Sequence, residues 1–380
     1  MQPYEIVIAG AGPVGLATAA LLAGGPAGEH LKIRLIDSSP RPQWNDADTD
    51  LRVYAVSAAA REVLADCGAL DMIAARRMSP YEQMRVWEGA TLESAAQLRF
   101  NSADIGLASL GHIVEDSLIR VALHAALERN CSVEMAFARQ VESIDMTSRR
   151  VSLTLDGERS PLNAHLLIGA DGAQSRVRAA AELPGVERDY AQQAIVAHIG
   201  SEHNHARTAW QRFLPGGPLA LLPLADGRSS LVWSLPEAAA QQWMAADADQ
   251  FSQRLTYASG NVLGGLRLAS ERVSLPLIAR HAHTYCRPRL VLVGDAAHSV
   301  HPLAGQGVNL GLADAAELAH RISDAVIAGQ DPGDLRVLRR YERARKGANL
   351  LMLGALDGLD RLFRAPRAFS PIRSAGLRVV

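Results

Sequence analysis

Short apolar runs that each end at a glycine or an aspartate predict the buried strands of an α/β fold. The runs at 5–9 and 290–293 are continuous rather than alternating, which is typical of strands with both faces covered. Each is followed by a helical pattern, over 14–22 and from about residue 307, in which apolar residues recur three and four positions apart. A further run at 31–36 ends at an aspartate. Strand and helix therefore alternate along this part of the chain.

The pattern changes between residues 187 and 276. Strand-like runs at 194–199, 219–222 and 230–234 are separated by glycine and proline turns, and one helix is expected over 236–258. This predicts a second domain with a mostly antiparallel sheet that walls a pocket against the first. The aromatic residues among these strands are more often core than ligand-facing. Within them, Arg212 and Phe213 are the weak substrate-binding candidates.

Three glycines follow the first strand in the spacing that binds a dinucleotide. Gly10 makes the turn, Gly12 admits a pyrophosphate, and Gly15 lets the helix pack on the strand. Asp37 ends the next strand and would accept hydrogen bonds from the adenosine ribose, the alternative being a solvated turn residue. A helical run is expected to begin at Asp50, and its Arg52 carries a guanidinium that suits a pyrophosphate.

A second glycine loop follows the strand at 290–293. Gly294 and Asp295 end the strand, Pro302 forces a turn, and Gly305 and Gly307 keep the backbone bare before the helix. A carboxylate there can accept from a ligand hydroxyl, and a helix N-terminus favours the negative charge of a reduced flavin. The alternative is a crossover whose glycines serve packing alone.

A third strand, 166–168, also ends at a carboxylate, Asp171. Asp171 would brace its loop or meet a cofactor or cosubstrate, and taken alone it is more often a turn cap.

Composition excludes several classes of protein. The chain has 380 residues, enough for two domains, with 48% hydrophobic and 21% charged residues, as in a globular enzyme. A net charge of −1 argues against nucleic-acid binding. Cys67, Cys131 and Cys286 are widely spaced, so neither a disulfide framework, a zinc site nor any other metal is expected, and a reducing cytosol fits. The apolar start at 4–22 is broken by glycines, which indicates a fold element rather than a signal peptide.

The C-terminal part leaves two interpretations open. A charged helix is expected over 332–347, and the stretch 349–363 is strongly apolar and is accompanied by arginines up to Arg378. Such a segment could lie on an anionic membrane surface. The alternative, which the pattern favours, is a terminal helix packed on the core.

Taken together, these motifs resemble the single-component flavoprotein aromatic hydroxylases, the p-hydroxybenzoate hydroxylase-like group, over nearly the whole chain. The runs 301–311, 50–52 and 111–115 look more specifically like the ubiquinone-biosynthesis hydroxylases. One departure stands out, because close relatives carry an Asn-Arg pair where this chain has Asp116 and Ser117.

The resemblance implies a non-covalently bound FAD, with NAD(P)H as a transient cosubstrate and O2 as oxidant. The flavin would be lined by the backbone of Pro302, Gly305 and Gly307, which is the catalytic part of the loop. His298 and His301 lie nearby, and packing or loop hydrogen bonding is expected for them. The implied cofactor-binding residues are Gly10, Gly12, Gly15, Asp37, Arg52, Asp171, Gly294, Asp295, Leu303, Ala304, Gln306, Val308 and Asn309.

The implied activity is hydroxylation of a polyprenylated phenol in ubiquinone biosynthesis, through a flavin hydroperoxide. The alternatives are the same chemistry on a soluble aromatic acid, and a non-catalytic flavin-binding scaffold subunit of a biosynthetic assembly. A cytoplasmic protein, with peripheral contact at the inner membrane surface, is expected. The expected domains are a Rossmann-like FAD-binding domain (1–75, 100–183 and 277–347), a substrate domain (76–99 and 184–276) and a C-terminal helical segment (348–380).

Overall fold

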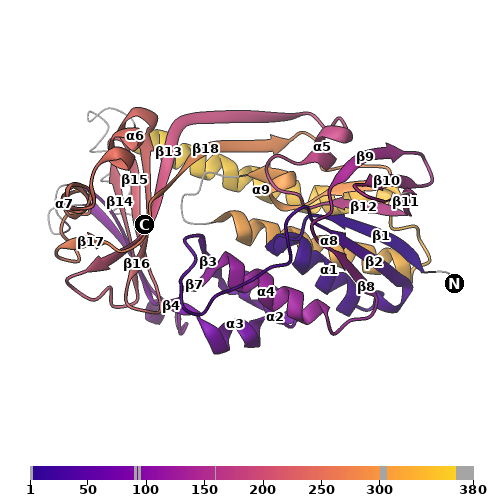
Figure 1. Cartoon of the computed structure of the whole chain (residues 1–380), viewed down its shortest axis with the longest axis horizontal. Helices are drawn as coiled ribbons and strands as arrows, with labels where there is room; N and C mark the ends of the chain where they lie inside the picture. Colours follow the sequence, from indigo (N-terminus) through magenta and orange to yellow (C-terminus); the bar gives the residue numbers. More distant parts are fainter. Residues whose placement is uncertain (1–2, 90–91, 93–95, 159, 300–305, 365–380) are drawn as a thin grey trace.

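The structure is a computed structural model that describes residues 3–89, 92, 96–158, 160–299 and 306–364. Figure 1 shows one sheet with its helices at one end of the molecule and a second sheet at the other. The mixed α/β class, with a Rossmann-like part, a mostly antiparallel sheet and helix at the C-terminal side, is confirmed.

The first sheet has five parallel strands and one antiparallel edge strand. It is built from β1 (Tyr4–Ala9), β2 (Leu31–Ile36), β8 (Val133–Ala136), β12 (Leu166–Gly169), β20 (Leu290–Leu292) and β19 (Cys286–Arg287). Their order is β19-β20-β12-β1-β2-β8, and β19 is the antiparallel member. The central strands of this sheet are the continuous apolar runs, as expected for strands that are buried on both faces.

Helices surround the first sheet, and there are two small sheets. The helices are α1 (Pro13–Gly24), α2 (Ala58–Asp66), α3 (Leu70–Arg76), α4 (Asp116–Leu127), α5 (Arg176–Ala180), α8 (Gln306–Ile327) and α9 (Leu335–Arg364). One small sheet contains β9 (Val141–Met146), β10 (Val151–Leu155) and β11 (Leu162–Ala164), and the other β3 (Val53–Ser57), β4 (Ser79–Tyr81) and β7 (Gly111–Glu115). The β3-β7-β4 sheet packs against the second large sheet. Helix α1 packs against α4 and α8, and α8 packs against α9.

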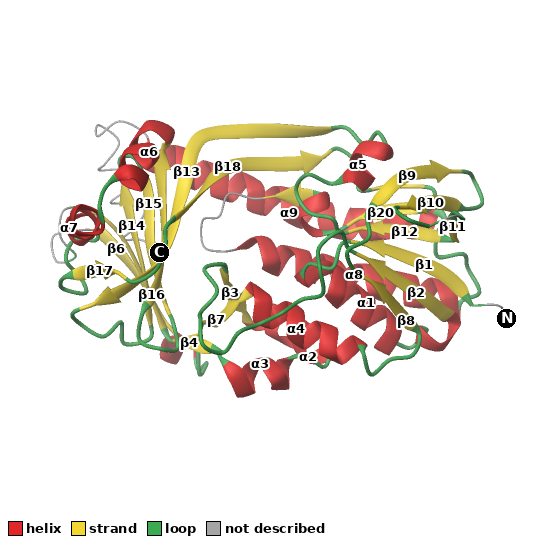
Figure 2. Cartoon of the chain, viewed as in Figure 1, coloured by secondary structure: helices red, strands yellow, loops and turns green. Residues whose placement is uncertain are grey.

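The second sheet is antiparallel except where β14 meets β5. Its strands are β5 (Gln83–Glu88), β6 (Ala96–Asn101), β13 (Gly185–Ser201), β14 (Thr208–Leu214), β15 (Gly217–Pro223), β16 (Ser229–Pro236), β17 (Leu266–Leu268), β18 (Val273–Ala282) and β21 (His298–Ser299). Their order is β21-β18-β13-β16-β15-β14-β5-β6, and β17 pairs with β13. Figure 2 shows the long strands β13 and β18 running from this sheet toward the first one.

The two faces of the second sheet serve different purposes because side chains alternate along a strand. Ile195, Leu221, Leu231 and Trp233 belong to a core that also contains Phe251 and Leu255. These last two come from α7 (Ala248–Ala258), which follows α6 (Glu237–Ala245). The intervening positions on the strands point to the opposite face, toward the first domain.

Three expectations about individual elements were wrong. The helix expected over 236–258 is divided into α6 and α7 at Asp247, whose carboxylate accepts from the Gln250 N–H and caps the second helix. The run from Asp50 begins with β3, since Val53 to Ser57 pair with β7, and becomes helical only at α2. The charged helix expected over 332–347 does not end at Gly347 but continues to Arg364 as α9.

The domain boundaries stay a prediction, and β18 crosses the expected boundary at 276. Among the described residues, no helix is both long and apolar enough to cross a membrane.

Candidate active site

A cavity of about 1050 Å³ extends from the first glycine loop to the inner face of the second sheet. Its volume is at the upper end of what small-molecule sites enclose, so it has room for a dinucleotide and a further ligand. The sequence-predicted residues that line it are Gly10, Gly12, Asp37, Arg52, Asp171, Asp295, Gln306, Gly307 and Val308. Pro302, Leu303, Ala304 and Gly305, together with His301, lie outside the described residues.

The first glycine loop leaves space for a ligand at one position. A Cβ at Gly10, where φ is +107°, would lie 2.3 Å from the Ala170 oxygen, and one at Gly15 would lie 1.9 Å from the Gly10 oxygen. These two glycines therefore allow strand and helix to pack closely. A Cβ at Gly12 would meet no atom within 4 Å and would project into the cavity. No side chain caps α1 at Gly12, so its N-terminal N–H groups suit a pyrophosphate.

Asp37 braces the same loop. One carboxylate oxygen accepts from the Ala11 N–H and the other from the Ser39 N–H at 2.6 Å. The side chain still lines the cavity at the end of β2. Asp37 is therefore positioned by the backbone at the point where a ribose would be bound.

Asp171 contacts the turn that follows β12. Its carboxylate accepts from the Ser175 hydroxyl at 2.5 Å and from the Val177 N–H at 3.1 Å. These contacts describe the turn-capping role that the sequence allowed, and Asp171 also lines the cavity.

Charged groups meet at the middle of the cavity, around Arg52. Its guanidinium lies 5.5 Å from the centre of the Tyr54 ring, and the pKa of Arg52 is raised by Tyr54 and, further, by Asp116 and Asp295, although burial opposes this. Burial raises the pKa of Asp295, which His298 and Arg52 partly offset. An arginine between carboxylates keeps its charge, and the exposed Arg52 side chain can face an anionic ligand.

Asp116 is a cavity residue that sequence reasoning did not select. Its carboxylate accepts from the Tyr54 hydroxyl at 2.8 Å and lies 3.8 Å from the Arg120 guanidinium. The only sequence signal was its departure from the Asn of the related hydroxylases.

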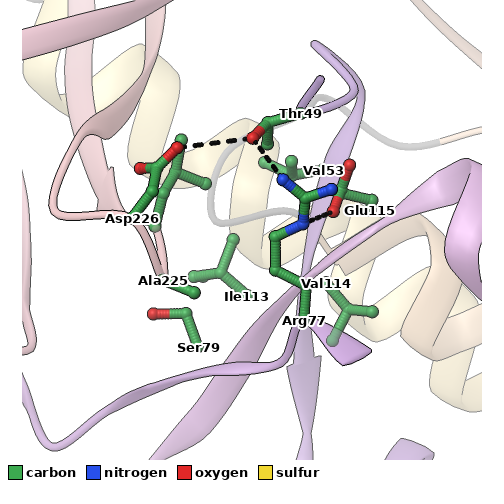
Figure 3. Close-up of a pocket in the computed structure, with 10 residues that line it drawn as sticks. Thr49, Val53, Arg77, Ser79, Ile113, Val114, Glu115, Ala225 and Asp226 are labelled. Carbon is green, nitrogen blue, oxygen red and sulfur yellow. Dashed lines mark hydrogen bonds and ion pairs between the residues drawn. The ribbon is translucent and has the colours of Figure 1, made fainter. Parts of the chain in front are cut away.

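The segment that carries Arg52 is held by a polar cluster between the two sheets (Figure 3). Arg77 pairs with the buried Glu115 at 2.9 Å and donates to the Thr49 hydroxyl at 3.0 Å. Thr49 also lies 3.4 Å from Asp226, which is in the turn between β15 and β16. Burial raises the pKa of Glu115. The hydrogen bond that Glu115 accepts from the Asp50 N–H and the charge of Arg77 both act in the opposite direction. The cluster thus connects the segment that precedes Arg52 with the second sheet.

The carboxylate of Asp314 on α8 is fully buried, and it supports the backbone on the Asp295 side of the cavity. It accepts from the Gly294 N–H at 3.1 Å, Arg345 Nε at 2.8 Å and Asn349 Nδ2 at 3.2 Å, and it contacts His298 Nε2 at 2.5 Å. Burial alone would raise the pKa of Asp314, but His298 and Arg345 bring it below its ordinary value. Gly294 begins the short 3-10 helix η3 (Gly294–Ala296), so this network supports the backbone next to Asp295.

Two other predicted cofactor residues and one of the histidines have structural contacts. A Cβ at Gly294, where φ is +58°, would lie 3.2 Å from Val14, so this glycine serves close packing on α1. The Asn309 amide accepts from the Ser57 N–H at 3.0 Å and donates to the Ala55 oxygen at 2.9 Å, which ties α8 to β3. His298 bonds to Asp314, as a loop-bracing role requires.

The structure places Arg212 and Phe213 away from the cavity. The Arg212 guanidinium donates to the backbone oxygens of Ala258 and Gly89, on the α7 side of the sheet. Phe213 lies buried toward the end of β14 and does not line the cavity either. Alternation along the strand explains the position of Arg212, because Gln211 faces the cavity and its neighbour Arg212 faces away.

A parallel sheet with a glycine cradle, closed by a second sheet over one cavity, defines a dinucleotide-binding oxidoreductase. The FAD binding domain family model matches residues 3–350. The mitochondrial ubiquinone biosynthesis monooxygenase COQ6 of Xenopus tropicalis is 36% identical over 406 residues, which cover 95% of this chain and 86% of that protein. The 3-demethoxyubiquinol 3-hydroxylase of Escherichia coli is 35% identical over 365 residues, covering 94% and 89%.

Solved structures agree in fold. PqsL of Pseudomonas aeruginosa, described as a probable FAD-dependent monooxygenase, superposes with a TM-score of 0.81 at 21% identity over the whole of both chains. Klebsiella pneumoniae HpxO complexed with FAD and uric acid gives 0.77 at 17% identity, covering 99% of this chain and 93% of that one. The chain therefore belongs to the FAD binding domain family, among its FAD-dependent monooxygenases.

We predict that Gly12→Ala weakens FAD binding without destabilising the apoprotein. Gly12 has φ −71° and ψ 177°, which alanine adopts freely, and the new methyl group meets only the space kept for the ligand. Overfilling such a space costs about 1–3 kcal/mol, so the FAD dissociation constant should rise roughly 10- to 100-fold. Fluorescence titration of the apoprotein measures it. Gly24→Ala, also without a neighbour within 4 Å, is the control, and equal affinities in the two variants would contradict the prediction.

We expect Asp314→Asn to lower the free energy of unfolding by roughly 3 kcal/mol, because it leaves Arg345 without its buried counter-charge. Since the folded pKa of Asp314 is depressed, its contribution is present above the unfolded pKa near 4 and is lost as the pH falls further, so the variant should lose less stability in acid. Denaturant unfolding at several pH values measures both effects.

The matched control for that prediction is Asp324→Asn on the same helix. Its partner His320 lies at 3.4 Å and both side chains are more than half exposed, so a change within about 0.5 kcal/mol is expected. Equal unfolding midpoints for the two variants would show that the buried network does not stabilise the fold.

Proposed function

We propose that this protein uses FAD, NAD(P)H and O2 to hydroxylate a polyprenylated phenol in ubiquinone biosynthesis. The observation that carries the proposal is the single cavity that joins the glycine cradle at Gly12 to an apolar wall on the second sheet. The relatives named for ubiquinone biosynthesis, aligned over almost the whole chain, support the same reaction class.

The chain's own residues would bind and orient the cofactor. The α1 N-terminus with Gly12 would hold the pyrophosphate, Asp37 the adenosine ribose, and Asp295 a hydroxyl of the ribityl chain. The backbone at Gly307 and Val308 would lie along the flavin at the start of α8. Bound FAD supplies the oxygen-transfer chemistry, and the protein supplies orientation and a site shielded from water.

The wall of the cavity favours a prenylated ring over a soluble aromatic acid. The strands of the second sheet contribute mainly alanine, valine and leucine side chains to it. The lining arginines, which are Arg52, Arg120, Arg139 and Arg176, all come from outside that sheet. An aromatic carboxylate would therefore meet no cation on the wall, whereas an apolar chain would be buried favourably.

Contact with a membrane is a further part of the proposal, because such a substrate is held in a lipid bilayer. Leu350 and Leu351 on α9 are 47% and 75% exposed, while Leu353 on the same helix packs against buried residues of β13 and β18. The helix is thus partly docked on the protein and leaves two adjacent leucines for a lipid surface. We propose a cytoplasmic protein with peripheral contact at the inner membrane surface.

We expect the purified holoenzyme to oxidise NAD(P)H faster with a prenylated phenol than with 4-hydroxybenzoate. Burial of the prenyl chain against the apolar wall is the physical reason. NAD(P)H absorbance and mass spectrometry of the product, one oxygen heavier, measure the reaction. Stimulation by the acid alone would favour the soluble-acid reaction, and no substrate-dependent oxidation with either compound would favour the scaffold function.

We predict that a Leu350→Ser/Leu351→Ser variant binds anionic phosphatidylglycerol vesicles about tenfold more weakly than the wild-type protein. The two substitutions remove apolar area from the lipid-facing helix without touching its buried side. Co-sedimentation measures binding, and Ile327→Ser at the end of α8, which is 61% exposed, is the control. Unchanged binding of the double variant would show that this part of α9 does not contact the membrane.

A further inference from the structure

The cavity reaches the surface on an apolar side as well as on a polar one. Among its described lining residues, those that lie outside the second sheet and are exposed are all polar, namely Ser38, Ser39, Arg52, Arg139 and Arg176. Those on the second sheet that are exposed are Val273, Leu275 and Pro276, close together on β18. We call these three residues the β18 mouth.

Val273 and Leu275 face the cavity and are also open to solvent. In the antiparallel register Val273 lies opposite Val196, and Leu275 lies opposite Ala194. Both of these β13 residues line the cavity, so the four side chains share one side of the sheet. Val273 is 38% exposed and Leu275 is 50% exposed, whereas Ala194 is 3% exposed. The apolar wall therefore extends from the interior of the cavity to the surface of the protein.

The β18 mouth is at the edge of the second sheet. The pairs between β18 and β21 involve Arg280 and His281, so the segment 273–276 has β13 on one side and, in the part of the chain that the structure describes, no strand on the other. An exposed apolar edge invites pairing with another chain, and Pro276 opposes it because proline has no N–H to donate. Exposed apolar side chains at this edge therefore suit an apolar ligand better than a further β-strand.

The proposed substrate requires an opening of this kind. The cavity of about 1050 Å³ has to hold FAD and the aromatic ring, and this volume is already at the upper end of what small-molecule sites enclose. A polyprenyl chain of several units adds apolar volume for which the cavity has no space. Such a chain is stabilised where it crosses an apolar surface, and it would have to desolvate charged groups at the polar side.

The β18 mouth lies next to the helix that we propose for membrane contact. Leu275 has Ala194 opposite it and Leu277 two positions further along β18. Ala194 and Leu277 belong to the buried cluster on which Leu353 of α9 packs. Leu350, which is 47% exposed, lies three residues before Leu353 and therefore on the same side of α9. A chain that leaves the cavity over Leu275 would thus reach the apolar surface of α9.

We propose that the polyprenyl chain of the substrate leaves the cavity through the β18 mouth. The aromatic ring then lies inside, on the cofactor side, and the chain crosses Val273 and Leu275 toward the lipid. The inference rests on the proposed function and adds the route of the chain. Because the chain beyond the mouth is not enclosed, the enzyme should accept prenyl chains of different lengths.

Binding of two probes to the oxidised holoenzyme tests the route without turnover. The probes are 2-methylphenol, which has the ring without a chain, and 2-farnesylphenol. Both are titrated in the absence of NAD(P)H and followed by the visible absorbance of bound FAD. The wild-type protein should bind 2-farnesylphenol more tightly. Leu275→Ser should weaken 2-farnesylphenol about tenfold and leave 2-methylphenol unchanged, because it removes apolar contact only at the mouth.

Val186→Ser is the matched control. Val186 is also an exposed apolar residue of the second sheet, on β13, with 59% of its surface accessible, but it does not line the cavity. This variant should bind both probes as the wild-type protein does. Val273→Ser should weaken 2-farnesylphenol alone, as Leu275→Ser does, and it serves if the Leu275 variant does not retain FAD.

The outcomes separate this inference from the proposed function. An equal loss of affinity for both probes in the mouth variants, or unchanged binding of 2-farnesylphenol, overturns the route and leaves hydroxylation of a prenylated phenol intact. If binding is unchanged and sedimentation shows a wild-type dimer that Leu275→Ser dissociates, the edge is instead a contact between two copies of the chain. A wild-type holoenzyme that does not prefer 2-farnesylphenol contradicts both the route and the prenylated substrate. Loss confined to 2-farnesylphenol in the mouth variants, with Val186→Ser unchanged, supports the route.

Discussion

The buried carboxylate of Asp314 is the contact on which the cofactor side of this molecule depends. An ionised carboxylate without exposure is stable only when it is fully paired, and Asp314 has four partners from three elements. They are the Gly294 N–H at the end of β20, His298 on β21, and Arg345 and Asn349 on α9. One side chain thereby fixes the strand end, the start of the glycine loop and the C-terminal helix in a single arrangement.

On the other side of the cavity, the apolar wall depends on the alternation of side chains in the second sheet. One set of residues, with Trp233 and Leu231 among them, packs beneath α6 and α7. The other set, with Ala220 and Val232 among them, is mostly small and faces the cavity. Large residues on the first face stabilise the sheet, while small ones on the second keep the cavity open. The same strands therefore provide both the core and the wall of the site.

The sequence predicted those parts whose signal is local. The glycines between β1 and α1, the aspartate after β2 and the apolar run of β20 lie within short stretches that each define strand, turn and helix. The sequence could not reveal the Asp314 network, because Gly294 and Arg345 are far apart in the chain and each looks ordinary alone. The sequence did not show which face of β14 carries Arg212, and alternation along the strand places Gln211 at the cavity and Arg212 on the α7 side.

The distance between cofactor and wall is set by polar contacts in the segment 45–52. Asp50 donates its N–H to Glu115, and its carboxylate accepts from the Arg52 and Ser117 N–H groups. Thr49, one residue earlier, contacts Arg77 and also Asp226 and Arg228 in the turn that precedes β16 of the second sheet. The segment that carries Arg52 is therefore bonded to the turn that precedes β16, whose Val232 lines the cavity wall. Because oxygen transfer tolerates little displacement between the two reacting groups, directional bonds at this junction control the reaction more closely than the adaptable apolar packing on either side.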